Sequence, residues 1–243
     1  MTDQSLQFPR FYVTAPAPCP YLPGREERKV FTELSGPDAR ELNEALHRVG
    51  FRRSQSVAYR PACEGCQACV SVRVLARRFR PQRRMRRIAA RNRDLVARPG
   101  PPRVEAEHFA LLKRYLAARH AEGGMADMDF AEYATMIENS PVETEVIEYR
   151  ERLEDGDGHL LAVALTDVLS DGLSMVYSFF EPDAPRRSLG TYMILDHIAR
   201  TRAMNRDHVY LGYWIAESPK MAYKSHFRPF ERLEADGWHP CED

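Results

Sequence analysis

The stretch that decides the fold runs from residue 173 to residue 192 and reads LSMVYSFFEPDAPRRSLGTY. Its first part, 173–180, is apolar and aromatic and follows a Ser-Asp-Gly turn, which predicts a strand. A loop follows, and residues 187–204 carry apolar side chains at helical spacing. Residues 208–215 then predict another strand. The chain thus places two predicted strands on either side of one long predicted helix.

The flanking residues extend this pattern. Apolar spacing predicts helices at 105–119 and 129–138, strands at 143–151 and 160–168, and a last helix at 219–226. Helix, helix, three strands, helix, strand, helix is the element order of the GCN5-related acyltransferase fold, an α+β fold with a mixed, mostly antiparallel sheet. In that fold the strands at 173–180 and 208–215 would part and admit an acyl donor from one side and an amine from the other.

The N-terminal part predicts a small α/β module with a cysteine cluster. It contains short predicted strands, including one at 51–59, a helix at 37–49 and an arginine-rich helix at 81–96. Residues 99–102 read PGPP and predict a domain boundary, because proline ends helices and central strands. We therefore expect a cysteine- and arginine-rich domain at 1–98 and an acyltransferase-like catalytic domain at 104–243.

Composition indicates a globular protein of the cytoplasm. Hydrophobic residues make up 44% of the 243 residues and charged residues 29%. No apolar run approaches the ~20 residues that span a bilayer, and no secretory signal begins the chain, so we expect no membrane partner. Five cysteines, three of them clustered, argue against a disulfide framework and for a reducing compartment. The oligomeric state is not predicted.

Charge is strongly polarised although the formal net charge is zero. Residues 73–98 hold eleven arginines and one acid, a local charge of +10, whereas residues 104–185 have a local charge of −13. On the predicted helix at 81–96, Met85 and Ile88 lie on one face and most of the arginines on the other. Arginine's planar fork suits phosphate, so we expect a nucleic-acid partner. The alternative is a solvated face paired with the acidic second half.

The cysteine cluster predicts a metal site or a redox-sensitive one. Cys63, Cys66 and Cys69 follow one another at two-residue spacing, and thiolates so spaced can bind zinc or an iron–sulfur cluster. A fourth ligand is needed, and Cys19 is the natural candidate, with Cys241 behind it. The alternative is a set of free thiols in a tight turn.

The loop before the long helix argues against coenzyme A. Acetyl-CoA enzymes of this fold carry R/Q-x-x-G-x-G/A there, so that backbone N–H groups hold the pyrophosphate. Arg187 and Gly190 fit this pattern, but Tyr192 occupies the final small position. A CoA-dependent N-acetyltransferase remains an alternative that Tyr192 disfavours.

Aromatic and cationic residues alternate in 210–230, which reads YLGYWIAESPKMAYKSHFRPF. Lys220 and Lys224 are half of the protein's four lysines and lie one helical turn apart. Core packing explains Leu211, Ile215 and Met221 but not two close lysines. For each aromatic residue taken singly, burial is the simpler interpretation.

Together these strings resemble the bacterial aspartate/glutamate leucyltransferases, relatives of the eukaryotic arginyl-tRNA–protein transferases. The matching strings span nearly the whole chain in order: CPYLPGR (19–25), GFRRS (50–54), YRPAC (59–63), QRR (82–84), RN (91–92), SFFEP (178–182), SLGTY (188–192), YLGYWI (210–215) and PKMAYK (219–224). The resemblance implies transfer of leucine from Leu-tRNA to the α-amine of a protein that begins with Asp or Glu. That transfer marks proteins for degradation by the N-degron (N-end rule) pathway and requires no cofactor.

The resemblance also implies site residues. The catalytic set is Tyr192, Tyr213, Lys220 and Tyr223; the substrate-binding set is Trp214, Lys224, Arg228 and Ser178; the tRNA-binding set is Arg83, Arg84, Arg87 and Arg91; the metal set is Cys19, Cys63, Cys66 and Cys69. Lys220, Lys224 and Arg228 would hold the acceptor's carboxylate, and the aromatic residues would shape the leucyl and adenosine pocket. A further alternative is a non-catalytic RNA-binding or redox-sensing protein with a vestigial cleft.

Overall fold

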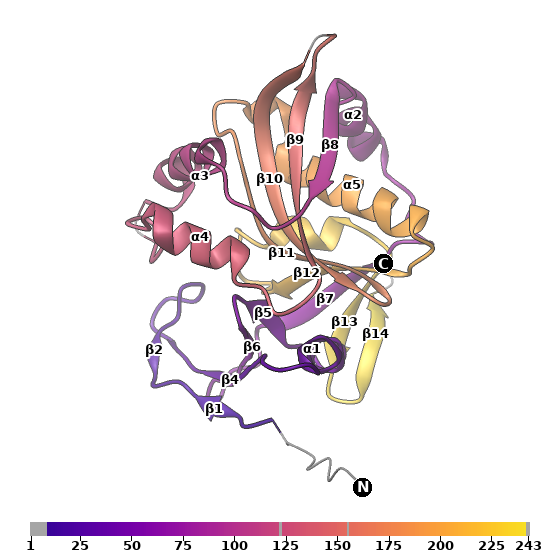
Figure 1. The fold of residues 1–243 in the computed structure, drawn as a ribbon. Coiled ribbons are helices and arrows are strands. Elements are labelled where there is room, and N and C mark those ends of the chain that lie inside the picture. Colours follow the sequence, from indigo (N-terminus) through magenta and orange to yellow (C-terminus); the bar gives the residue numbers. More distant parts are fainter. Residues whose placement is uncertain (1–8, 122, 155, 242–243) are drawn as a thin grey trace, which may run out of the picture.

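The computed structural model describes residues 9–121, 123–154 and 156–241, and an eight-stranded sheet forms its centre (Figure 1). The strand order is β14-β13-β7-β12-β11-β10-β9-β8. In chain order these strands are β7 (Val70–Leu75), β8 (Leu95–Gly100), β9 (Thr144–Arg152), β10 (Asp157–Leu169), β11 (Gly172–Phe180), β12 (His208–Trp214), β13 (Phe230–Glu234) and β14 (Gly237–Cys241). Only the β11–β12 pair among these is parallel, which confirms the predicted mixed, mostly antiparallel sheet.

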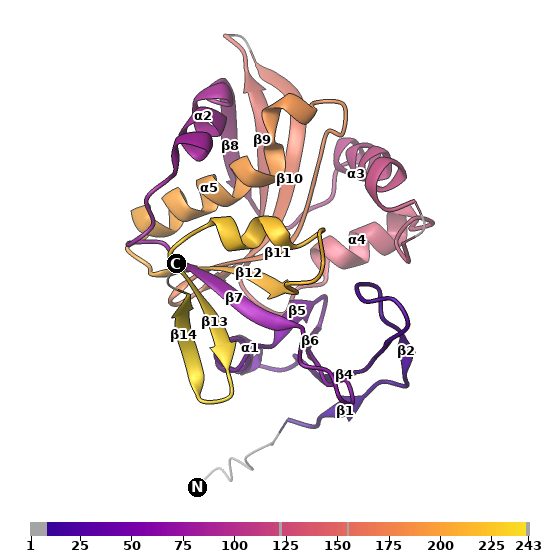
Figure 2. The same ribbon diagram turned by 180° about the vertical axis from the view of Figure 1, so that it is seen from behind.

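Helices cover both faces of this sheet (Figures 1 and 2). They are α2 (Arg83–Arg91) and α5 (Leu189–Ala203) on one face and α3 (Ala106–Arg119) and α4 (Phe130–Glu138) on the other. Alternate residues of a strand point to opposite faces. Accordingly, Val163 of β10 packs into the core under α3 and α4, and the neighbouring Ala162 packs beneath α5.

The N-terminal residues form the small module that the sequence predicts. Its four-stranded sheet has the order β1-β4-β6-β5, and a separate two-stranded sheet pairs β2 with β3. The elements are β1 (Tyr12–Val13), β2 (Ala17–Pro18), β3 (Glu26–Glu27), β4 (Lys29–Glu33), α1 (Ala39–Arg48), β5 (Arg52–Ser54) and β6 (Val57–Pro61). The single strand predicted at 51–59 is wrong: Gln55, with φ of 51°, turns the chain into the β5–β6 hairpin.

The domain boundary predicted at 99–102 coincides with the end of a strand, since Pro99 and Gly100 belong to β8. The helix predicted to reach residue 96 ends at Arg91, and β8 begins at Leu95 and includes Pro99 and Gly100, which face Ile147 and Val146 of β9. β8 is an edge strand, where a proline is tolerated. β7 also comes from the N-terminal part and lies inside the sheet. The two segments predicted as separate domains therefore share one sheet, as far as the described residues show.

The parting of β11 from β12 is the feature that positions the site. The two strands pair only from Gly172–His208 to Ser174–Tyr210. Beyond this point β11 stays with β10 and β12 stays with β7, so the predicted separation is confirmed. A short helix, η1 (Pro185–Arg187), leads into α5, and a 3-10 helix, η2 (Ala222–His226), replaces the longer helix predicted after β12. Within the described residues, none of the helices combines the length and the apolar character that crossing a bilayer requires.

Candidate active site

The guanidinium of Arg52 occupies the point where β11 and β12 part. Arg52 comes from β5, and its Nη2 donates to Met175 O at 2.6 Å, the first β11 carbonyl beyond the paired residues. On the facing strand, Gly212 has φ of +82°, and a Cβ there would lie 3.5 Å from Arg52 Cζ. Arg52 is 7% exposed, and its Nη1 has no hydrogen-bond partner among the described residues. This burial lowers the pKa of Arg52.

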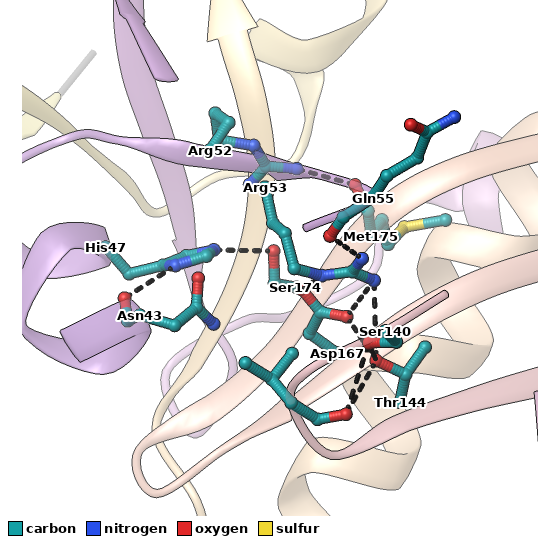
Figure 3. Close-up of polar contacts among 11 residues, drawn as sticks. Asn43, His47, Arg52, Arg53, Gln55, Ser140, Thr144, Asp167, Ser174 and Met175 are labelled. Carbon is teal, nitrogen blue, oxygen red and sulfur yellow. Dashed lines mark hydrogen bonds and ion pairs between the residues drawn. The ribbon is translucent and has the colours of Figure 1, made fainter. Parts of the chain in front are cut away.

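The next residue, Arg53, fixes β5 to the central sheet (Figure 3). Its Nε and Nη2 donate to the two carboxylate oxygens of Asp167 on β10 at 2.7 and 2.6 Å, and both side chains have no exposed surface. Thr144 Oγ1 donates to the same carboxylate at 2.8 Å, and Arg53 Nη1 donates to Gln55 O at 2.8 Å. Such a bidentate pair fixes direction as well as distance, so it sets where Arg52 points.

His47 makes a second connection between the module and the sheet (Figure 3). Its ring nitrogens lie 3.1 Å from Asn43 O and 3.1 Å from Ser174 Oγ, the last β11 residue that pairs with β12. Burial, followed by the charge of Arg52, lowers the pKa of His47 to about 4. The ring is therefore neutral near neutral pH, so Nδ1 donates to Asn43 O and Nε2 accepts the Ser174 hydroxyl proton.

Lys224 of η2 is the second cation at the split. Its Nζ donates to Tyr213 O on β12 at 2.6 Å, and burial, followed by the charge of Arg52, lowers the pKa of Lys224 to about 7. The Tyr213 hydroxyl points to the N-terminal module and donates to Gly50 O and Tyr59 O, both at 3.0 Å. Lys224 is thus near the split, whereas the Tyr213 hydroxyl is hydrogen-bonded to the N-terminal module.

A cavity of about 740 Å³ opens beside the end of β12. It lies between the cysteine loop and the β13–β14 hairpin, and Arg60, Tyr213, Trp214 and Arg232 contribute to its lining. The Trp214 ring packs against Phe230, while its buried Nε1 has no partner among the described residues. Aromatic and cationic walls of this kind suit a nucleobase and its phosphate.

The end of α3 brings further aromatic groups toward η2. The Tyr115 ring lies 5.0 Å from the ring of Phe180, and Tyr223 of η2 is within electrostatic reach of Tyr115. Burial, followed by the charge of Lys220, lowers the pKa of His120, which places Lys220 close to this helix end. Both Lys220 and Tyr223 are exposed.

The remaining predicted residues lie elsewhere. The Tyr192 ring packs 5.9 Å from Tyr149 in the core between α5 and β9. Arg228 lies over the Phe230 ring and donates to Cys241 O at 3.4 Å. Ser178 is half-buried on β11 opposite Ala164. The structure thus gathers Tyr213, Trp214, Lys220, Tyr223 and Lys224 around the end of β12 and gives Tyr192 and Arg228 other neighbours.

The arginine of the loop before α5 is already paired with other residues of the chain. Arg187, the arginine of the expected pyrophosphate motif, pairs with Asp94 at 2.9 and 2.8 Å and with Glu151 at 3.2 Å. Asn92 Nδ2 donates to Arg187 O at 2.8 Å. The corner between α2 and β8 therefore engages the Arg187 guanidinium, which would otherwise be free to meet a pyrophosphate.

The basic helix α2 lies beside α5, so its charge is next to this loop (Figure 2). Met85 and Ile88 are buried as predicted, while Arg83, Arg84, Arg87 and Arg91 are exposed. In the part of the chain that the structure describes, Arg83, Arg84 and Arg87 form no ion pair, so the alternative of pairing with the acidic half gains no support.

Cys63, Cys66 and Cys69 of the predicted metal set lie between β6 and β7, and Cys19 approaches them from the β2–β3 loop. Burial, followed by the neighbouring thiols of Cys63, Cys19 and Cys66, raises the pKa of Cys69 to about 11. Arg25 Nη1 donates to Cys66 Sγ at 3.2 Å. A tetrahedral zinc site needs its sulfurs about 3.8 Å apart, but no three of these described sulfurs lie within 4.8 Å of one another. No three of these sulfurs are therefore as close together as the ligands of a single zinc ion.

Comparison with known proteins decides the family. The model of the arginine-tRNA-protein transferase N terminus matches residues 17–87, and that of the C terminus matches residues 107–234. The chain belongs to the arginine-tRNA-protein transferase family. An aspartate/glutamate leucyltransferase of Parvibaculum lavamentivorans is 59% identical over 99% of this chain and 100% of its own. Proteins of the same name from a Bradyrhizobium strain and from Brucella ovis are 58% and 56% identical over 100% of this chain and 96% and 100% of their own.

Sequence analysis of this transferase missed the residues at the base of the split. The string GFRRS was part of the resemblance, but it gave Arg52 and Arg53 no role. The available signal was two consecutive arginines in a predicted strand, one of which must face the interior. Neither His47 nor Asp167 belongs to a local motif, because their partners come from distant elements.

Proposed function

We propose that the chain transfers leucine from Leu-tRNA to the α-amine of proteins that begin with Asp or Glu. The observation that carries the proposal is the split between β11 and β12, with a basic helix on one flank and a loop occupied by Arg187 where acyl-CoA enzymes hold pyrophosphate. A donor carried by RNA requires the basic helix and does without a loop that binds pyrophosphate. The full-length relatives named aspartate/glutamate leucyltransferase support this choice of donor and acceptor.

The transfer itself is an aminolysis. The neutral acceptor nitrogen attacks the ester carbonyl carbon, and a tetrahedral oxyanion forms. As it collapses, the nitrogen loses one proton, the C–O bond of the ester breaks, and the ribose oxygen of the tRNA leaves as a hydroxyl that has gained a proton. An α-amine has a pKa of about 7.7–8, so part of it is already neutral and nucleophilic near neutral pH. Positioning of two bound substrates supplies much of the rate, and hydrogen-bond donors at the split stabilise the oxyanion.

Roles for the described residues follow from their positions. Arg83, Arg84, Arg87 and Arg91 contact tRNA phosphates on the flank of α5. Tyr213 and Trp214 line the cavity of about 740 Å³ and shape the space for the terminal adenosine and the leucyl group. Tyr223, which is outside this lining, extends the aromatic surface on η2. Lys224 is the predicted cation at the split, and Lys220 lies near His120 at the end of α3. Tyr192 packs against Tyr149 and Arg228 binds Cys241 O, so this proposal gives them no role.

The cysteine set has a structural role in this proposal. Cys19, Cys63, Cys66 and Cys69 would hold an iron–sulfur cluster that joins the β2–β3 loop to the β6–β7 loop. Metal analysis and visible absorption of anaerobically purified protein test this assignment, and protein purified in this way without bound iron would contradict it.

The decisive experiment supplies purified protein with charged tRNA and peptides. Labelled leucine should move from Leu-tRNA to peptides that begin with Asp or Glu and not to one that begins with Ala, and Arg-tRNA should be a poor donor. Absence of transfer, or transfer of acetyl groups from acetyl-CoA, would overturn the proposal. The product would carry an N-terminal leucine, which in the N-degron pathway marks a cytoplasmic protein for degradation.

A further inference from the structure

The base of the split holds a buried positive charge that no carboxylate of the described chain neutralises. Arg52 is 7% exposed, uses Nη2 for Met175 O, and has no partner for Nη1 among the described residues. The charge of the Asp167 carboxylate influences it, but both oxygens of Asp167 bind Arg53. A guanidinium does not lose its proton in proteins, so this charge persists in the fold.

An uncompensated buried charge is expensive to maintain. Its effects are visible on the groups around it, since the charge of Arg52 contributes to the lowered pKa of both His47 and Lys224. A role as a spacer between the strands requires only the bond to Met175 O, which an uncharged amide could also make. The charge and the spare donor therefore point to an anion that comes from outside the chain.

Lys224 is the second cation at the split, and it is more exposed than Arg52. Its Nζ donates to Tyr213 O at the end of β12. Among the described residues, Arg52 is the charged group that influences Lys224, and no carboxylate pairs with it. Arg52 and Lys224 thus bind carbonyls of β11 and β12 where these strands part, and no carboxylate of the described residues pairs with either.

We propose that Arg52 and Lys224 form the pocket for the side-chain carboxylate of the acceptor's N-terminal Asp or Glu, with Arg52 as the inner anchor and Lys224 as the outer contact. This inference rests on the proposed function, because it names how that same site selects its acceptor. It also explains why a neutral acceptor of the same shape is rejected: an N-terminal Asn or Gln would leave both cations unpaired. The bidentate pair of Arg53 with Asp167 positions the anchor.

The first test compares acceptor peptides that begin with Asp or Asn. Arg52→Gln should lower kcat/KM for the Asp peptide by about 30-fold or more, and change that for the Asn peptide little, with the KM for Leu-tRNA unaltered. The matched control is Arg48→Gln in the same module, whose side chain is 63% exposed, and it should leave the ratio of Asp to Asn as in the wild type. Equal losses for both peptides in Arg52→Gln would mean that Arg52 only spaces the strands, and the inference would fall.

The second test needs neither catalysis nor a folded Arg52 variant. A carboxylate bound between the cations favours the charged form of Lys224, so binding of the Asp peptide near neutral pH should take up protons. Calorimetry in buffers of different ionisation enthalpy measures this uptake, which should disappear in Lys224→Met. Identical proton uptake in wild type and Lys224→Met would overturn the pocket. Binding with proton uptake but without leucine transfer would overturn the proposed function and leave the pocket in place.

Discussion

Replacement of Asp167 by asparagine isolates the ion pair that joins the N-terminal module to the central sheet. The substitution keeps the shape of the side chain and removes its charge, which leaves the guanidinium of Arg53 buried without a counterion. Neither side chain has exposed surface, and the donor–acceptor distances of 2.7 and 2.6 Å are those of a full bidentate pair. Breaking such a pair costs about 3–5 kcal/mol, a large part of the roughly 5–15 kcal/mol that stabilises a typical protein.

Urea unfolding followed by tryptophan fluorescence measures this cost. The matched control is Asp94→Asn, which removes a carboxylate that also binds an arginine fork, that of Arg187, but is 47% exposed. Exposed pairs contribute about 0–1 kcal/mol, so the control should unfold close to the wild type. A loss in Asp167→Asn no larger than that of the control would refute the reasoning.

The double variant Arg53→Met, Asp167→Leu separates charge from packing. If the loss in Asp167→Asn comes from the orphaned guanidinium, removal of both charges should restore most of the stability, because apolar replacements of buried pairs are often neutral. A double variant as unstable as Asp167→Asn would show instead that the pair's geometry matters more than its charge balance.

Three further predictions concern ionisable side chains. Lys224→Met should stabilise the fold, and the gain should be roughly 3 kcal/mol larger at about pH 6 than at about pH 9. The folded pKa of Lys224, about 7, lies below its unfolded value, so the buried lysine is fully charged only at pH values below its folded pKa. The free energy of unfolding of the wild type should fall by roughly 3 kcal/mol as the pH falls from about 6.5 to about 4. In this range His47 binds a proton in the unfolded chain but not in the folded one, where its pKa is about 4. His47→Gln should remove that loss, as acid unfolding would measure. Gln at Arg84 and Arg87 together should weaken Leu-tRNA binding and lower the salt slope of log K by about 1 per residue in filter binding.

Local sequence signals were sufficient for most elements of the catalytic half. Asp129 and Glu132 illustrate this, since the N-cap and third residue of α4 make the reciprocal capping box that ends a loop and begins a helix. The same holds for the order of strands around α5 and for the buried face of α2, which contains Met85 and Ile88. These features depend on residues a few positions apart, and periodicity reports them directly.

Pairings between distant segments could not be predicted in this way. Residues 70–75, VSVRVL, predict a strand, but nothing in them indicates β12 and β13 as neighbours. Arg53 and Asp167 are 114 positions apart, and a charged residue in a strand is normally solvent-facing. The sequence therefore predicted the split between the strands but not the buried cation at its base.

Arg52 and Arg53 are adjacent, yet the structure treats their charges in opposite ways. Successive strand residues point to opposite sides, so fixing one determines the other. Arg53 is neutralised by Asp167, and its position obliges Arg52 to lie between β11 and β12, where no carboxylate of the described residues pairs with it. One buried charge is thus paired and its neighbour is not, a combination expected at a functional site rather than in a core selected for stability alone. The N-terminal module is therefore part of the acceptor site, because without β5 the split would lose its anchor and keep only Lys224.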